Sequence, residues 1–334
     1  MSPSPTLLIL LFAILLFGFL DGFHTSASVV ATVISSRAMR ARHALWLAAV
    51  AELVGPFLFG VAIAQTIGRD LADPSSLTAA AVLTAVLSSI LWKLFTWWRA
   101  IPSSPAFSLV GGLVGAVLAG SGASALSGPG LVRILLSLVG SPIVGLLAGY
   151  LIMRLTLLLV QGATPRINLL FKRAQLLTTV GLALSHGTND GQKIMALIGL
   201  AMVTTGMVEN FDLPLWVVAI SAAVLSLGTL TSGMRIIRTV GGRFYKIRPV
   251  HSFAAQTTAG LVILTAALLG GPVSSTQVVN TAVLGVGAAE RLGKVRWQVF
   301  YDIALAWALT LPVTMLVAIL LYRPVAGLLL ILQR

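Results

Sequence analysis

The sequence contains no cysteine and few charged residues. The absence of cysteine excludes disulfide bonds, thiolate metal sites and thiol catalysis. Only 9% of the 334 residues are charged, whereas about a quarter are charged in ordinary soluble domains. The four histidines are scattered and form no H-E-x-x-H pairing, which argues against a membrane-embedded metal hydrolase. No phosphate-cradling P-loop is present, so the expected energy source is an ion gradient and not ATP.

Hydrophobic residues dominate the composition of the chain. They make up 57% of the chain, and the mean hydropathy is +1.00. Apolar stretches of about 20 residues, long enough to cross a bilayer, recur along the whole sequence and give roughly ten segments when partial ones are counted. The sequence therefore predicts an all-α polytopic protein of the cell membrane, of the prokaryotic cytoplasmic type, with the lipid bilayer as its surroundings.

The net charge of +13 comes mainly from Lys and Arg in short connectors between apolar segments. This distribution is typical of membrane topology and contact with lipid headgroups, and does not indicate nucleic-acid binding. Because some segments are expected to re-enter the membrane, the connectors do not fix which side of the membrane each one faces. Membrane orientation and assembly as a homo-oligomer both stay open.

The chain divides near Pro165 into two halves with the same order of segments, residues 1–165 and 166–334. Each half starts with a long apolar run that a polar sequence interrupts, which predicts a broken helix. Each half later carries a Gly/Ser-rich segment, 101–129 and 271–289, that is too short and too polar for an independent span. We expect these segments to form re-entrant hairpins. Interrupted segments at matching positions of two repeats indicate a secondary transporter with inverted repeats.

The two polar interruptions are Asp21-Gly-Phe-His-Thr-Ser-Ala-Ser28 and His186-Gly-Thr-Asn-Asp-Gly-Gln-Lys193. A polar break in lipid costs several kcal/mol for each unsatisfied backbone group, so it persists where it lines a cavity or binds a ligand. Backbone N–H groups at helix breaks, together with hairpin hydroxyls, suit a tetrahedral oxyanion. The intramembrane carboxylates Asp21, Asp190 and Glu52 would suit a cation, because burying a charge without a function is expensive.

These residues carry a family resemblance. His186-Gly-Thr-Asn-Asp-Gly-Gln-Lys193 resembles the second signature of the inorganic phosphate transporter (PiT) family, and Asp21-Gly-Phe-His24 resembles the first. Pro102-Ser-Ser104 and Pro272-Val-Ser-Ser-Thr276 agree as well, and the matches follow the family order over nearly the whole chain. The resemblance implies an inverted-repeat secondary carrier, not an enzyme. It would move inorganic phosphate, or in some members sulfate, with Na⁺ or H⁺ and without a cofactor.

The first signature departs from the family pattern. The family usually has Asn at Asp21, Asp at Thr25 and Asn at Ser28, so the carboxylate has moved by four residues, about one helical turn. Lys93 stands where Asn is expected. Two interpretations of Lys93 stay open: it snorkels toward the interface near Trp97 and Trp98, or its ammonium replaces a bound cation and one cation site is lost or altered.

The resemblance implies alternating access, with the two repeats rocking around the ion. Asp21, Asp190 and Glu52 would couple the cation, with Asp21 and Asp190 as Na⁺ ligands. The expected substrate ligands are hydroxyl, amide and ammonium groups of the two signatures and the two hairpins: Thr25, Ser28, Ser103, Ser104, Asn189, Lys193, Ser274, Ser275 and Thr276. The alternatives are a carrier of sulfate or another tetrahedral oxyanion, and a membrane sensor or scaffold that transports nothing.

Overall fold

The computed structural model describes residues 4–72, 77–99, 103–164, 166–232 and 247–332. Apart from an isolated bridge between Ala72 and Leu126, its regular elements in these ranges are all helical, which confirms the all-α prediction. The elements are α1 (Pro5–Ser35), α2 (Ala41–Phe59), α3 (Ala62–Gln65), η1 (Thr66–Asp70), α4 (Ala79–Trp98), α5 (Pro105–Gly120), η3 (Ala123–Ala125), α6 (Gly128–Leu159), α7 (Ile167–Thr204), α8 (Leu215–Thr231), α10 (Pro249–Leu268), α11 (Ser275–Glu290), η4 (Leu292–Lys294) and α12 (Trp297–Leu332).

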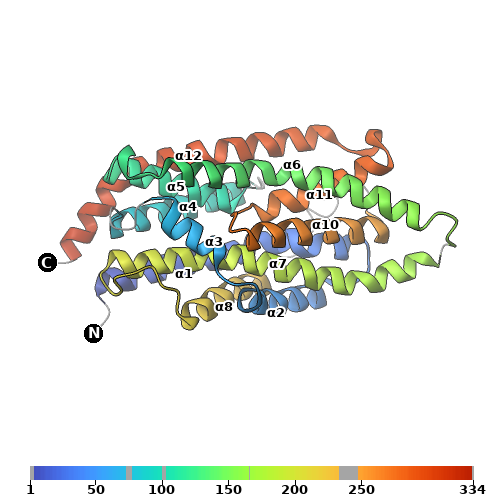
Figure 1. The fold of residues 1–334 in the computed structure, drawn as a ribbon, viewed down its shortest axis with the longest axis horizontal. Helices are drawn as coiled ribbons and strands as arrows, with labels where there is room; N and C mark the ends of the chain where they lie inside the picture. The colour runs from blue at the N-terminus through green and yellow to red at the C-terminus, as the bar shows by residue number, and fades with distance from the viewer. Residues whose placement is uncertain (1–3, 73–76, 100–102, 165, 233–246, 333–334) are drawn as a thin grey trace.

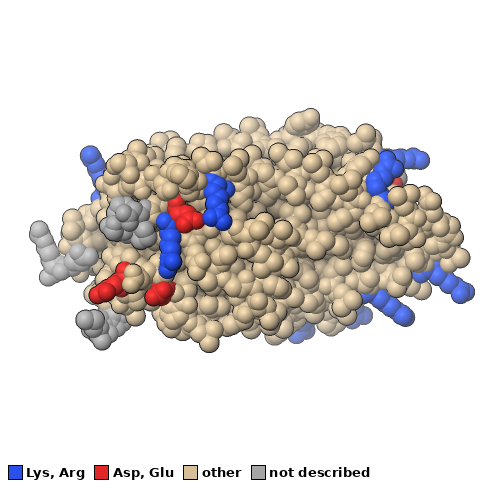
Figure 2. Space-filling model, viewed as in Figure 1, with Lys and Arg blue, Asp and Glu red and all other residues tan. Residues whose placement is uncertain are grey.

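The helices lie along one long axis (Figure 1). Six of those in the described ranges, α1, α2, α4, α6, α10 and α12, are long and apolar enough to cross a membrane. On the face seen in Figure 2, charged side chains gather toward the two ends and leave an uncharged band between them. The chain is a multi-pass protein of the cell membrane.

Corresponding helices of the two halves run in opposite directions. In Figure 1, α1 starts at the end that holds the N-terminus, whereas α7 starts at the other end and runs back. The long helices α6 and α12 are opposed in the same way, and the chain ends near the side where it began. In these two pairs, the helix of the second half therefore runs opposite to its counterpart in the first half.

The prediction that polar sequences break the first helix of each half is wrong, because α1 and α7 are continuous. Hydroxyl groups in the polar runs bond back to carbonyls one turn earlier: Thr25 Oγ1 donates to Asp21 O at 2.8 Å, and Thr188 Oγ1 donates to Leu184 O at 2.8 Å. Such bonds satisfy the hydroxyls without opening the backbone. The polar groups that α1 and α7 bring to the site are therefore side chains of intact helices.

The hairpins are larger than the sequence predicted, because the preceding helix forms the other arm of each. Helices α4 and α5 pack together at one end of the molecule, and α10 and α11 pack together at the other (Figure 1). The tips of the two hairpins meet, since Ser104 Oγ donates to Ser274 Oγ at 2.7 Å. Pro102 lies outside the described residues.

Each hairpin packs against the long helix of the other half. Helix α5 lies on α12, and α11 lies on α6. Glycines that align between the two hairpins permit these contacts. A Cβ on Gly115 would lie 2.2 Å from Met315 O, and a Cβ on Gly285 would lie 2.1 Å from Leu146 O. No side chain fits at either distance, so glycine is required for the two backbones to approach.

Four helices, called here the central group, pack against the hairpin arms α4 and α10. Helices α1, α2, α7 and α8 pack against one another, with α1 against α8 and α2 against α7. Polar contacts between pairs of side chains connect this group to the hairpin arms, as described below. The halves of the sequence are therefore interleaved in space.

Candidate functional site

Asp190 has four polar partners among the described residues. It lies on α7 and is 1% exposed. Its Oδ1 pairs with Lys193 Nζ and accepts from Asn189 Nδ2 at 2.8 Å, while its Oδ2 accepts from Ser275 Oγ at 2.7 Å and lies 2.8 Å from His186 Nε2. Three of these partners come from the same helical run as Asp190, and Ser275 comes from the first turn of α11. Asp190 thus ties α7 to the second hairpin.

The second hairpin is also held through its tip. Lys193 Nζ donates to Val273 O at 2.9 Å, and Asn189 Nδ2 donates to the same carbonyl at 3.0 Å. Val273 N donates in return to Asn189 Oδ1 at 3.3 Å. An apolar residue in a loop gave no sequence signal for this role, because only its backbone is used.

Glu52 joins three helices of the central group. Its Oε1 lies 3.0 Å from His186 Nδ1, so the imidazole bridges Glu52 on α2 and Asp190 on α7. Its Oε2 accepts from Thr229 Oγ1 on α8 at 2.6 Å. Thr229 was not among the predicted site residues, although a fully buried hydroxyl in an apolar helix is the signal that could have indicated it.

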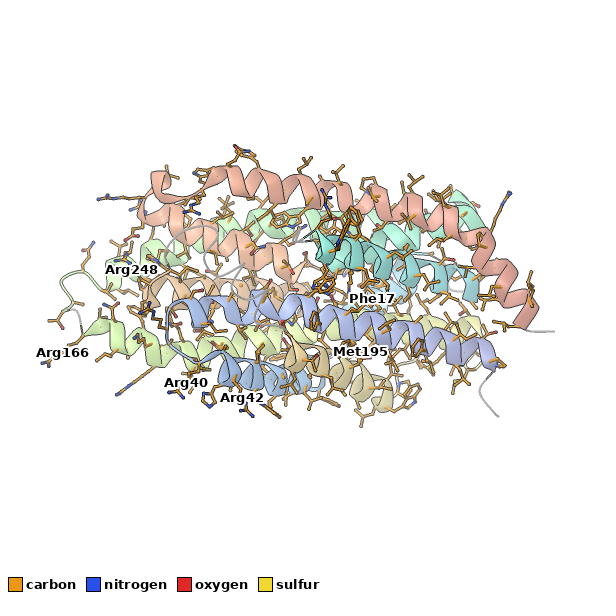
Figure 3. The ribbon with its side chains drawn as sticks, turned by 180° about the vertical axis from the view of Figure 1, so that it is seen from behind. Phe17, Arg40, Arg42, Arg166, Met195 and Arg248 are labelled. Atoms are coloured by element: carbon orange, nitrogen blue, oxygen red, sulfur yellow. The ribbon has the colours of Figure 1, made fainter. Side chains whose placement is uncertain are left out.

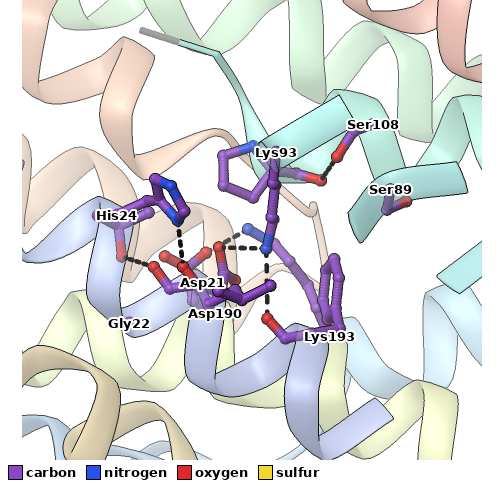
Figure 4. A network of polar contacts seen from close by, with 12 residues as sticks. Asp21, Gly22, His24, Ser89, Lys93, Ser108, Asp190 and Lys193 are labelled. Atoms are coloured by element: carbon purple, nitrogen blue, oxygen red, sulfur yellow. Dashed lines mark hydrogen bonds and ion pairs between the residues drawn. The ribbon is translucent and has the colours of Figure 1, made fainter. Parts of the chain in front are cut away.

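Asp21 forms the second buried ion pair, with Lys93 (Figure 4). Lys93 Nζ lies 3.0 Å from Asp21 Oδ1, 3.4 Å from Phe17 O and 3.6 Å from the centroid of the Phe17 ring. Lys93 is 1% exposed, and Asp21 is 0% exposed. The snorkelling interpretation of Lys93 is therefore wrong, since its ammonium points inward. Asp21 also lies within Coulombic range of Asp190 and Lys193.

The hairpin tips bring two helix N-termini together. Ser104 caps α5, and Ser274 caps α11; each accepts a backbone N–H three residues later at 3.4 Å. Helix N-termini present N–H groups and the positive end of the helix dipole, which favour an anion. Figure 3 labels Phe17, next to Lys93, near the middle of the long axis. The N-terminal turns of α5 and α11 meet beside these ion pairs.

The remaining predicted ligands are less closely tied to this centre. Ser103 is half-buried and pairs with Thr96 at 2.9 Å. Thr25 is buried, but its hydroxyl is used by its own helix. Ser28 and Thr276 are buried in α1 and in the first turn of α11. In the described ranges, no three His, Asp or Glu side chains are grouped as a metal site.

Comparison with known proteins agrees with this geometry. The profile of the phosphate transporter family matches residues 21–318. The chain belongs to that family. Among family members, a "Probable low-affinity inorganic phosphate transporter" of Bacillus subtilis is 37% identical over 313 residues, covering 92% of this chain and 93% of that protein. One of the same description from Rhizobium meliloti is 35% identical over 320 residues, covering 95% and 96%.

A solved structure supports the fold of this family member. The chain described as "The sodium-dependent phosphate transporter" superposes with a TM-score of 0.86 and covers 96% of this chain and 99% of its own length. The sequence identity is 23%, so the likeness is one of fold. The PiT resemblance, found first on short motifs, thus extends over nearly the whole chain.

Proposed function

We propose that this chain carries inorganic phosphate across the cell membrane together with a coupling cation, Na⁺ or H⁺, by alternating access. The observation that carries the proposal is a buried centre where two Asp–Lys pairs adjoin the N-terminal turns of α5 and α11. Buried ionisable groups in a membrane protein mark ion or substrate pathways, because their burial is costly.

The donors at this centre fit an oxyanion. Lys93 and Lys193 supply ammonium groups, Ser104 and Ser274 supply hydroxyls, and the two helix ends supply backbone N–H groups. All of these groups except the two ammoniums are uncharged, which suits an anion that must be released on the other side. A scaffold that binds no ion would have no need for this set of buried donors.

The charges of the centre favour coupling to a cation. The three carboxylates Asp21, Asp190 and Glu52 face two ammoniums, Lys93 and Lys193, and one imidazole, His186, so no fixed positive charge is left over for an anion. Adding an anion to buried carboxylates is unfavourable in a low-dielectric interior. Entry of a cation with the anion removes this cost, and that is the physical basis of coupling.

One oxygen favours phosphate over sulfate. Asp21 Oδ2 is buried and accepts no hydrogen bond from any described residue. A phosphate that keeps a proton can donate a P–OH hydrogen bond to this oxygen, whereas sulfate has no proton to donate. Sulfate or another tetrahedral oxyanion is therefore the weaker candidate.

The moving parts would be the hairpins and the central helices. The halves 1–165 and 166–334 serve as inverted repeats in this proposal, but their helices are interleaved, so neither half can rock as one rigid unit. The contacts Lys93–Asp21 and Ser275–Asp190 both cross from a hairpin arm to the central group. Their exchange would open the centre to one side at a time.

Charge distribution supports an orientation. Arg40, Arg42, Arg166 and Arg248 lie toward the same end of the molecule (Figure 3), and basic connectors face the cytoplasm in most membrane proteins. The absence of native cysteine makes this directly testable with single cysteines. A membrane-impermeant maleimide should label Asp212→Cys in intact cells and should label Arg40→Cys only after lysis.

The function itself is tested by uptake into proteoliposomes. Purified protein should accumulate radiolabelled phosphate when a Na⁺ or H⁺ gradient is imposed, and unlabelled phosphate should compete at least tenfold better than sulfate. Equal competition by sulfate would make the carrier a general oxyanion carrier. Absence of uptake under either gradient would contradict transport.

A further inference from the structure

The site has two carboxylates that pair with lysine, Asp21 and Asp190. At Asp21, the side chain of Lys93 places a positive charge that is part of the protein itself. We infer that its ammonium occupies the position of a coupling cation at Asp21, so this half-site binds no transported cation. The inference rests on the proposed transport function and specifies how many charges move with each phosphate. Lys93 would then help to set how many cations move with each phosphate. This role is distinct from binding the substrate.

The geometry around Lys93 is that of a fixed counterion. Its Nζ lies 3.0 Å from Asp21 Oδ1 and 3.4 Å from Phe17 O, and the Phe17 ring covers it with its centroid at 3.6 Å. Two oxygens and an aromatic face suit an ammonium, which aromatic rings attract. A Na⁺ ion at the same place would have to displace this ammonium from a buried carboxylate. Leaving either charge buried without a partner is strongly unfavourable.

The other carboxylate of the site is arranged differently. Asp190 pairs with Lys193 from its own helix, and the same ammonium donates to Val273 O in the second hairpin. Lys93 instead lies on α4, an arm of the first hairpin, whereas Asp21 lies on α1 in the central group. The Lys93–Asp21 pair therefore spans the boundary along which we expect movement. The ammonium is covalently part of the protein, so it neutralises Asp21 without being transported.

The first experiment counts charge in proteoliposomes. At fixed phosphate and cation gradients, the membrane potential at which net phosphate flux vanishes gives the net charge that moves with each phosphate. Lys93→Met removes the ammonium and keeps a side chain of similar length. We expect this variant to move one positive charge more per phosphate than wild type. The double variant Asp21→Asn/Lys93→Met removes both charges and should return to the wild-type value.

A second measurement does not depend on transport. In detergent, cations should raise the melting temperature of Lys93→Met more than that of wild type, because a ligand of the folded state stabilises it by mass action. Na⁺ or added acid would be the probe, with choline chloride as the ionic-strength control. The double variant should show the wild-type response. If wild type takes up no phosphate, the transport proposal fails, whereas this melting comparison still tests the ammonium.

The outcomes separate cleanly. A folded Lys93→Met protein that moves the wild-type charge and shows the wild-type cation response would overturn the inference. If Lys93→Met does not fold in any cation or at low pH, the double variant decides. If the double variant moves the same charge per phosphate as wild type, Lys93 and Asp21 act as a neutral pair that adds no transported charge. A different charge per phosphate in the double variant contradicts the inference. Lys93→Arg, which keeps the positive charge, should retain the wild-type stoichiometry.

Discussion

The two half-sites hold their carboxylates in different ways. Both oxygens of Asp190 are occupied, by an amide, a hydroxyl, an imidazole and an ammonium, whereas only Oδ1 of Asp21 has a partner. Where the chain keeps the family signature, a network of neutral and charged donors positions the carboxylate. Where the signature is rewritten, one ammonium from another helix takes over that role.

The hairpin tips differ in the same sense. Ser275 follows the capping serine of α11 and donates to Asp190, whereas Pro105 follows the capping serine of α5 and can donate nothing. The second tip is thus bonded to the central helices by side chains and backbone, whereas Ser104, among the described residues of the first tip, bonds to Ser274 of the second tip.

The largest effect should come from Asp190→Asn, which removes the charge at the centre of the second network. Removal of one partner from a buried ion pair costs about 3–5 kcal/mol. We therefore expect concentrative phosphate uptake to fall by a factor of about 100 or more. Uptake in proteoliposomes measures this, and the melting temperature serves as the control for folding. Concentrative uptake near the wild-type rate would remove Asp190 from the mechanism.

The aligned glycines Gly115 and Gly285 allow the two hairpins to be compared by the melting temperatures of matched variants. Gly285→Ala and Gly115→Ala each place a methyl group near 2.1–2.2 Å from a carbonyl oxygen of the facing helix. Overpacking of this kind costs about 1–3 kcal/mol, so both variants should melt at lower temperature by similar amounts. Gly140→Ala, on α6 with open space at its Cβ, is the matched control. An effect confined to one hairpin would contradict their equivalence.

Asn189→Ala should loosen the second hairpin tip while leaving the ion pairs in place. It deletes both hydrogen bonds to the backbone of Val273 and the amide hydrogen bond to Asp190 Oδ1, and unsatisfied buried groups cost about 1–3 kcal/mol. We expect the KM for phosphate to rise by a factor of about 10. Thr204→Ala is a suitable control, since Thr204 bonds only to carbonyls of its own helix in the described structure. An unchanged KM would mean that the tip does not contribute to binding.

The smallest effect should come from Ser104→Ala, at the contact between the hairpins. It removes the bond to Ser274 and the cap of α5, with an expected cost of about 0.5–2 kcal/mol. Uptake should fall by a few-fold. Ser108→Ala, which deletes a hydroxyl bonded to Pro105 O within the same helix, should change uptake less. If Ser108→Ala lowers uptake more than Ser104→Ala does, contact between the tips has no role in transport.

The sequence indicates which polar residues lie in the apolar helices, but not what they contact. Asp190, Lys193 and Asn189 stand out because polar groups in an apolar helix are costly, and only the structure shows that Lys193, expected as a substrate ligand, pairs with Asp190. Lys93 and Asp21 lie 72 positions apart, so their pairing depends on the packing of α4 against α1. The continuity of α1 and α7 was missed because Thr, Ser and His side chains bond back to their own helix, which no pattern of hydrophobicity reveals.

Each hairpin packs on a long helix of the other half, α5 on α12 and α11 on α6. This arrangement has a consequence for how the protein is made. Helix α5 is covered by α12, the last helix in the described part of the chain, so the first hairpin lacks this partner until α12 has been made. A ribosome that stops before α12 would release a chain whose Gly-rich α5 face has no partner. Such a fragment should be a target for membrane quality control, and α12 supplied as a separate peptide should rescue it.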